Sequence, residues 1–247
     1  MTRSSFVTIT IARFDELTAV DAPAARPPAG QPLMWSVGAD EHAAGMEFGT
    51  QRAYSWLALG LHHSDHSAHA LFEAERDATP VFPYAAEVWS AVLQPYAHHG
   101  VVNWLDPKNP GLVFEPGPRP SERAPFVAIT SVGWTLDDRF EVGKAMDFGR
   151  GVAAVRSNMN DVDGLLFQHG FNFPGLLAVD GPTVTMWQDD TATRAFAYRA
   201  GVHKTEMDHF RLHDTADRSS FTRLRVLRSR GSVQGHTPTA EESEQQR

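Results

Sequence analysis

The sequence contains no cysteine, no long apolar run and no excess of basic residues. Without cysteine the chain cannot form disulfides, thiolate nucleophiles or thiolate metal ligands, so any metal must be held by histidine or a carboxylate. No apolar run approaches the roughly 20 residues that a bilayer-spanning helix needs. A net charge of -8, without any Lys/Arg-rich block, argues against nucleic acid or an anionic membrane surface as a partner.

The residues that are present indicate a water-soluble globular protein. A chain of 247 residues with 42% hydrophobic content can bury a substantial core. The first fifteen residues have the pattern of a strand and not of a secretion signal, so we expect a cytoplasmic location. The sequence also contains 12 histidines, and imidazole is both a common metal ligand and the usual acid or base near neutral pH.

The first half of the chain is predicted to contain mainly strands. Residues 6–14 (FVTITIARF) alternate with period two and are rich in β-branched side chains, which is typical of a half-buried strand. Further strands are expected at residues 33–38, 53–61 and 99–105. Ser64 is a candidate N-cap for a helix, which Pro80 and Pro83 interrupt and which resumes over residues 84–93.

The middle of the chain separates two halves. Residues 106–125 contain six prolines, which is typical of an extended surface connection. After it, strands are expected at residues 126–135, 165–171, 183–187 and 221–227. Helices are expected at residues 137–159 and 191–213, the second capped by Thr191. Residues 237–247 are polar and acidic, so we expect a disordered tail whose removal leaves folding unchanged.

The order of predicted elements repeats between residues 1–105 and 126–236. Each half reads as a strand, a variable stretch, two strands, a helix and a strand, although the first half lacks a clear helix after its first strand. This order is that of a ferredoxin-like βαββαβ unit. We therefore predict an α+β fold in which two ferredoxin-like repeats join their sheets into one barrel, with the helices outside.

The second half also resembles a known family. TVTMWQDDTATRAFAYRAGVHKTEM, followed by FTRLRVLRSRGSVQG, is similar to the spheroidene monooxygenase family, which shows a strand ending in Trp, a helix leading to Gly-x-His and a closing Arg-x-Arg-Val-Leu strand. The resemblance implies a haem-containing oxygenase with a dimeric α+β barrel fold. Chlorite dismutases, dye-decolourising peroxidases and aldoxime dehydratases share this fold, so the fold alone does not choose the chemistry.

The Gly-x-His step corresponds here to Gly201, Val202 and His203, so the resemblance implies that His203 is the iron ligand of haem b. Helical spacing sets Phe196, Ala200, His203, Met207 and Phe210 on one stripe, which would line the porphyrin. The alternative is a core histidine whose nitrogens are satisfied by backbone carbonyls. Ser131 and Val132 depart from the family, which is expected to have a Thr-Arg pair in this strand.

Other side chains are candidates for the rest of such a site. Alternation along residues 165–171 places His169 on an apolar strand face, where it could position an oxidant or substrate opposite the iron. The alternative is a surface or edge histidine without such a role. Gln168 points the other way and is the alternative donor. Arg150 and Arg156 could pair with haem propionates, or they could be ordinary surface arginines.

The run HHSDHSAH invites a zinc hypothesis for His62, His63, His66 and His69. The spacing argues against it, because His62 and His63 are expected to face opposite sides of a strand end and no HExxH motif is present. A solvated helix start is the preferred interpretation.

The leading functional hypothesis is a haem-dependent oxygenase that acts on an apolar or small organic metabolite with O2 or peroxide. A second hypothesis keeps the haem but assigns a dehydratase or lyase that acts on an N–O substrate such as an aldoxime. A third is a non-enzymatic protein that binds haem or a hydrophobic ligand. A small-molecule substrate and a homodimer are expected, without nucleic acid or a membrane span.

Overall fold

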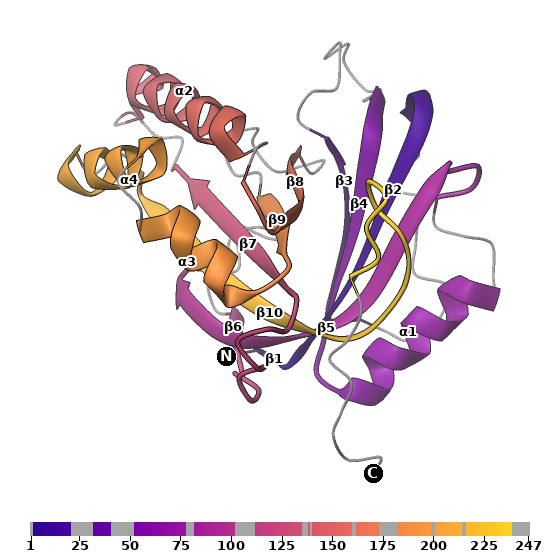
Figure 1. The fold of residues 1–247 in the computed structure, drawn as a ribbon. Helices are drawn as coiled ribbons and strands as arrows, with labels where there is room; N and C mark the ends of the chain where they lie inside the picture. The colour runs from indigo at the N-terminus through magenta and orange to yellow at the C-terminus, as the bar shows by residue number, and fades with distance from the viewer. Residues whose placement is uncertain are drawn as a thin grey trace.

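The chain folds into a closed barrel of antiparallel strands with helices on its outer surface (Figure 1). This computed structural model describes residues 2–20, 32–40, 52–77, 82–101, 112–134, 138, 140–159, 162–172, 182–198, 201–213 and 216–238. The strands are β1 (Thr2–Ser4), β2 (Phe6–Ala19), β3 (Met34–Asp40), β4 (Arg52–His62), β5 (Glu87–Gly100), β6 (Leu112–Phe114), β7 (Phe126–Gly133), β8 (Leu165–Asn172), β9 (Thr183–Trp187) and β10 (Arg218–Gly231). The helices are α1 (Asp65–Asp77), α2 (Val142–Met159), α3 (Asp190–Tyr198) and α4 (Val202–His213). The predicted α+β class is confirmed.

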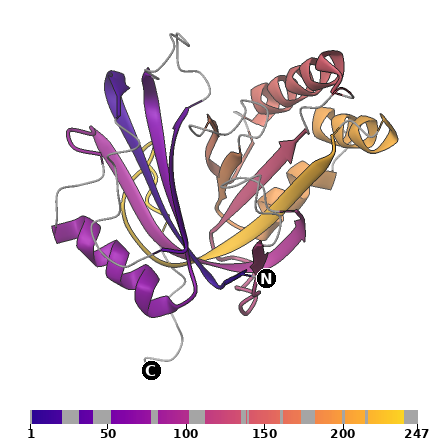
Figure 2. The same cartoon turned by 180° about the vertical axis from the view of Figure 1, so that it is seen from behind.

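The barrel runs in the order β10-β5-β2-β4-β3-β8-β9-β7 and closes between β7 and β10. The first half contributes β5-β2-β4-β3 and the second half β10-β7-β9-β8, so both halves use the same order of last, first, third and second strand. Figure 2 shows β10 running from the second half into the first. Outside the barrel, β1 pairs in parallel with β6, a short strand within the predicted Pro-rich connector.

The two faces of the barrel wall bury different sets of side chains. On β2, Val7, Ile9 and Ile11 point into the barrel, and each is at most 1% exposed. On the opposite face Ala12 joins the outer cluster formed with Trp56. Full burial of one such aliphatic side chain contributes about 1.5–3 kcal/mol. The interior core continues through β4, β5, β7, β8, β9 and β10, with Leu59, Trp89, Ile129, Phe167, Met186 and Leu224 among its members.

The helix predicted over residues 84–93 is wrong, because Glu87–Gly100 forms strand β5. Trp89, Ala91 and Leu93 face the barrel interior, while Val92 packs under α1 with Phe72. A strand that is buried on both faces has no period-two pattern, so its apolar run cannot be distinguished from a helix by periodicity.

The helix predicted over residues 191–213 is two helices, α3 and α4, separated by a short break that includes Gly201. Thr191 is not the N-cap. The backbone N–H of Ala192 donates to Oδ1 of Asp189, 2.8 Å away, so Asp189 caps α3. Ser64 does cap α1, accepting a hydrogen bond from the backbone N–H of Ser67 at 3.2 Å.

After β10 the chain turns back in a tight hairpin at one end of the barrel. Gly231 has φ 76°, and a side chain there would collide with the carbonyl of Val88. Gln234 and Gly235 both have positive φ, 52° and 75°, as in a type I′ turn, and Val233 and His236 pair on either side. Val233 is 1% exposed and belongs to the barrel core.

Glu87 holds this hairpin. Its carboxylate accepts hydrogen bonds from Ser232 Oγ at 2.9 Å and from the backbone N–H groups of Gln234 at 2.8 Å and Gly235 at 2.9 Å. Burial raises the pKa of Glu87, but these hydrogen bonds and the charge of Arg13 outweigh it and hold the pKa below its usual value.

The barrel also holds the first residues of the predicted tail. The carbonyl of Pro238 accepts hydrogen bonds from Trp89 Nε1 at 3.3 Å and Ser229 Oγ at 2.5 Å, and Pro238 is buried. Thr237 and Pro238 therefore belong to the folded barrel, and the remainder of the predicted tail lies outside the described residues.

No helix in the described part of the chain is long and apolar enough to cross a membrane.

Shortening the chain tests whether Pro238 is docked. A chain that ends at His236 loses two hydrogen bonds worth about 1 kcal/mol each, so we expect its Tm to lie roughly 2–8 °C below that of a chain ending at Pro238. Differential scanning calorimetry of the two chains measures the difference. Equal melting temperatures would show that the Pro238 contacts contribute nothing to stability.

Candidate functional site

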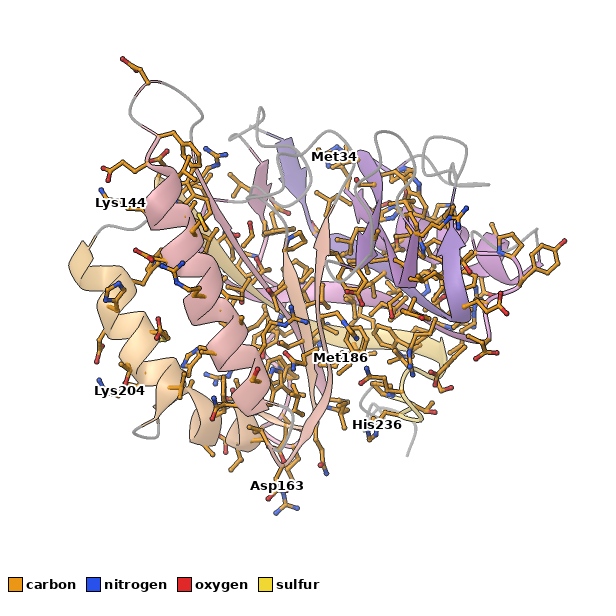
Figure 3. All side chains as sticks on the ribbon, turned by 90° about the horizontal axis from the view of Figure 1, so that it is seen from above. Met34, Lys144, Asp163, Met186, Lys204 and His236 are labelled. Atoms are coloured by element: carbon orange, nitrogen blue, oxygen red, sulfur yellow. The ribbon has the colours of Figure 1, made fainter. Side chains whose placement is uncertain are left out.

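The helices of the second half lie on the outer face of their sheet, with α2 and α4 side by side (Figures 1 and 3). In Figure 3, Lys144 on α2 and Lys204 on α4 are on the outer side of this layer, away from the strands. The layer differs from α1 in how completely it buries its apolar side chains. Leu71 and Phe72 of α1 are 0% and 3% exposed. In α2, α3 and α4, Met159 is buried at 5% exposure, but most other inward apolar side chains are only half-buried: Phe148, Val152, Val155, Phe196, Met207 and Phe210.

Asp190, the first residue of α3, fixes this helix to the sheet. Its buried carboxylate contacts Arg223 of β10 at 2.6 Å, Arg194 of α3 at 2.6 Å and Arg119 at 2.9 Å. Burial raises the pKa of Asp190, but these guanidinium groups outweigh it and hold the pKa below its usual range. A carboxylate at a helix N-terminus also interacts favourably with the helix dipole.

His203 lies in the first turn of α4, directly beside α3. Its ring centroid is 4.6 Å from that of Phe196, which in turn contacts Trp187 of β9 at 5.6 Å. Burial lowers the pKa of His203, and a backbone hydrogen bond with Ala197 opposes the shift in part, so the neutral imidazole is favoured. The Nδ1 atom of His203 is buried and has no hydrogen-bond partner among the described residues.

A second set of aromatic contacts continues this apolar region along α2 and α4. Phe148 contacts Trp134, after β7, with centroids 5.4 Å apart, and Phe210 with centroids 5.7 Å apart. The predicted stripe therefore survives the break between α3 and α4, because Phe196 still meets His203 and Phe210 still faces inward. Met207 is half-buried on the same helix, and Ala200 lies outside the described residues.

The structure does not bring His169 to His203. His169 shares the interior face of β8 with Phe167 and Phe171, whose ring centroids are 5.0 and 6.2 Å from its own. A bulge between Leu165 and Phe167 removes Leu165 from the predicted face. The sheet therefore separates His169 from the helix layer that carries His203.

Gln168 points to the other side of β8, as predicted. Its Nε2 donates to the carbonyl of Arg156 on α2 at 3.0 Å. Gln168 thus lies on the helix-covered side of the sheet, as His203 does.

The two candidate propionate ligands differ in environment. Arg156 is half-buried, and its burial lowers its pKa while the charge of Asp40 acts in the opposite direction. Arg150 is exposed and pairs with Asp147 one turn away on the same helix. Arg156 is therefore the better placed of the two to meet a buried anion.

In the described part of the chain, no group of three or more histidines and carboxylates is arranged to hold a metal ion, and this includes the histidine run that begins at the end of β4. His63 and His66 are exposed, and His69 pairs with Asp65 at 3.1 Å, which fits the predicted solvated helix start. His62 does not fit it, because it is 0% exposed.

His62 connects three elements of the first half. Its Nε2 lies 3.0 Å from Thr8 Oγ1 on β2, and its Nδ1 lies 2.9 Å from Ser67 Oγ on α1. Burial lowers the pKa of His62 to about 4. Its role is to satisfy buried hydroxyl groups beneath α1.

Two further residues of interest have no direct signal in the sequence. Asp40, at the end of β3, has its Oδ2 2.9 Å from Nδ1 of His169, and Gln234 of the hairpin has its Nε2 3.4 Å from Nε2 of the same ring. Asp40 is 5% exposed, which is unusual for a carboxylate and is the kind of feature that only a structure reveals.

Comparison with known proteins supports the fold only. No family model matches the chain, and no curated protein matches its sequence. An aldoxime dehydratase structure is similar with a TM-score of 0.55 and 6% identity over 90% of this chain and 82% of that one. An aldoxime dehydratase in complex with butyraldoxime has a TM-score of 0.54 and 9% identity, covering 90% and 80%. A structure described as a monooxygenase from Fusobacterium nucleatum is similar with a TM-score of 0.40 and 7% identity. The match covers 98% of this chain and 100% of that one.

The similarity to the two aldoxime dehydratases confirms an α+β barrel of the predicted general kind. At these identities it carries no information on substrate or cofactor. The resemblance to spheroidene monooxygenases has no matching family model and stays a prediction.

His62 should make stability depend on pH. The unfolded chain protonates His62 below its ordinary pKa of 6.5, whereas the folded chain resists protonation until the pH approaches its lowered pKa of about 4. Stability from this residue is therefore present above pH 6.5 and lost as the pH falls towards 4, by at most about 3 kcal/mol.

Urea unfolding of the wild type, His62→Gln and the exposed control His63→Gln at both ends of this pH window measures the effect. We expect His62→Gln to be less stable at neutral pH and to lose less stability on acidification than the other two proteins. An equal acid loss in all three would assign the pH dependence to other groups.

Proposed function

We propose that this protein is a haem-dependent oxygenase that acts on an apolar or small organic metabolite, with His203 as the axial ligand of haem b. The observation that carries the proposal is the state of His203. Its imidazole is kept neutral by burial, lies against Phe196 and has an enclosed nitrogen without a hydrogen-bond partner of good geometry within the described chain. A buried polar atom without a partner costs about 1–3 kcal/mol, and a bond to a metal would offset that cost.

The surroundings of His203 fit a haem. The flat faces of a porphyrin require apolar walls, and Phe196, Met207 and Phe210 present apolar surface that the protein itself leaves half-exposed. Arg156 would neutralise a propionate, with exposed Arg150 as the alternative. When bound, the haem supplies redox and oxygen chemistry that no amino-acid side chain provides.

The chain's own side chains would hold the haem, orient the substrate and shield the site. Asp190 ties α3 to β10 through Arg223, which fixes the position of Phe196 beside His203. Gln168, which is hydrogen-bonded to the carbonyl of Arg156, is a polar side chain on the helix-covered side of β8 that would orient a substrate there. Phe196 packs against the ring of His203, and Trp187 packs against Phe196.

We further propose that the two halves are ferredoxin-like repeats. The identical strand order in the two halves supports a duplication, as does the repeated placement of helices on the outer face.

A second candidate is dehydration of an aldoxime by the same haem-binding protein. The similarity of the fold to two aldoxime dehydratases, both with TM-scores above 0.5, favours including it. Such a reaction would consume no external oxidant, and His203 would keep the same role.

Haem content tests the assignment of His203. We expect the wild type, expressed with ample haem supply, to show a Soret band, and His203→Ala to lose most of its haem. Loss of a buried side chain also costs about 2–5 kcal/mol, so thermal melting must show that the variant is folded. His209→Ala, an exposed histidine on the same helix, is the matched control and should keep the wild-type spectrum.

Added imidazole should partly restore the spectrum of His203→Ala. A wild type that takes up no haem would instead support a haem-free protein that binds a hydrophobic ligand. A folded His203→Ala protein with full haem content and an unchanged Soret position would show that another residue is the ligand.

Assays with and without O2 or peroxide separate the two candidate reactions. Consumption of O2 or peroxide with turnover of an organic substrate supports the oxygenase, whereas release of a nitrile from an aldoxime without oxidant supports the dehydratase.

A further inference from the structure

Helix α2 presents an exposed apolar stripe to solvent. Val142 and Met146 are 60% and 58% exposed, and Gly149 and Ala153 follow them at exposed positions. These four residues are spaced i, i+4, i+7 and i+11 along the helix, so they lie on one face of it. We call them the α2 stripe. Single exposed apolar residues are ordinary, but a contiguous exposed stripe is typical of an interaction surface.

The neighbouring helix α4 does not cover the α2 stripe. A side chain added at Gly151 of α2 would collide with the carboxylate of Glu206 on α4, so α4 lies against that side of α2. Helical spacing sets Gly151 about 180° round the helix from Val142, at the start of the stripe. At Gly149, within the stripe, an added side chain would meet no other element of the described chain within 4 Å. The α2 stripe is therefore open to a partner.

The described structure gives Gly149 no packing role. Glycine destabilises a helix relative to alanine, because it loses more backbone entropy on folding. At Gly151 the missing side chain makes room for Glu206, whereas the space beside Gly149 is open within the described chain. Glycine is also the residue that lets another molecule approach a backbone closely. Its place in the α2 stripe therefore fits close contact with a second molecule.

The α2 stripe is complementary in size to itself. Along it, the long side chains of Val142 and Met146 come first and the small residues Gly149 and Ala153 follow. If a second copy of α2 packs antiparallel, Met146 lies opposite Gly149 of the partner subunit. In that same register Val142 lies opposite Ala153 of the partner subunit. Each long side chain then faces the space left by a small one, which is what a two-fold symmetric contact requires.

The charges beside the α2 stripe agree with the same register. Asp147 and Arg150 form an ion pair on α2, and their side chains are 56% and 69% exposed. In the antiparallel arrangement, Asp147 lies about 3 Å along the helix axis from the level of Arg150 of the partner subunit. The two Arg150 side chains are about 7.5 Å apart along the same axis. Opposite charges therefore meet across the contact, while like charges stay apart.

We propose that a second copy of this chain packs on the α2 stripe, so that two α2 helices form a symmetric antiparallel pair and the protein is a homodimer. A contact through one helix face is small, so the dimer is weak and its population depends on protein concentration. The dimer is independent of the proposed haem site, since Phe148 and Val152, on the inward side of α2, take no part in it.

Sedimentation velocity of the full-length protein, from micromolar to near-millimolar concentration, tests the proposal. We expect the wild type to change from monomer to dimer within this range. Gly149→Met fills the space for the partner's side chain, and Met146→Gly removes the side chain that enters it, so each should weaken the dimer at least about tenfold. The double variant Met146→Gly/Gly149→Met again sets a methionine opposite a glycine, and should recover most of the affinity.

Two controls make the test specific. Gly149→Met raises helix propensity, so a loss of dimer in this variant cannot be attributed to unfolding of α2. Lys144→Met adds a methionine to the outer side of α2, away from the stripe, and should leave the dimer unchanged.

Cross-linking tests the register, because the chain contains no cysteine of its own. Under mild oxidation, Met146→Cys chains mixed with Gly149→Cys chains should form a mixed disulfide dimer, whereas Lys144→Cys chains should stay monomeric. The proposal is overturned if the wild type remains a monomer at the highest concentration, which would leave the stripe to a different partner. It is also overturned if both single variants dimerise as the wild type does, or if the double variant recovers no affinity.

Discussion

Closure of the barrel through β10 is the constraint on which the rest of the structure depends. This strand pairs with β5 of the first half, from Ser220 opposite Gly100 to Gly231 opposite Trp89, and with β7 of the second half along its first part. In the described part of the chain, the other junction, between β3 and β8, is held by the pairs of Ala39 with Asn172 and Asp40 with Phe171. Among the described residues, the longer pairing therefore lies on the side of the barrel that β10 closes.

Closure also defines two chemically different faces. The inner face is a continuous apolar core interrupted by Asp40 and His169, whereas the outer face is covered tightly by α1 in one half and loosely by α2, α3 and α4 in the other. The buried carboxylate of Asp190 bridges the loose layer to β10 through Arg223, so the aromatic surroundings of His203 are fixed to the same strand that closes the barrel.

Sequence patterns predicted the elements whose two faces differ. Strands β2 and β8 could be predicted because their apolar side chains alternate along the sequence. The start of α1 could be predicted because Ser64 is a typical capping residue. The pattern failed for β5, which is buried on both faces, and for α3 and α4, whose apolar stripe continues across the break. His62 and Asp40 could not be assigned, because burial of a polar group depends on partners distant in sequence, such as Thr8 and His169.

The position of β10 as the last barrel strand in chain order has a consequence for biosynthesis. When a ribosome has made everything up to α4, β5 and β7 each still present an unpaired edge, because the strand that joins them has not emerged. Unpaired edges are templates for association with other chains, and Trp89 and Leu93 on β5 would then be exposed as well. The barrel therefore cannot close before β10 has been made, and the interval before β10 docks is when nascent chains are most prone to aggregate and most in need of a chaperone.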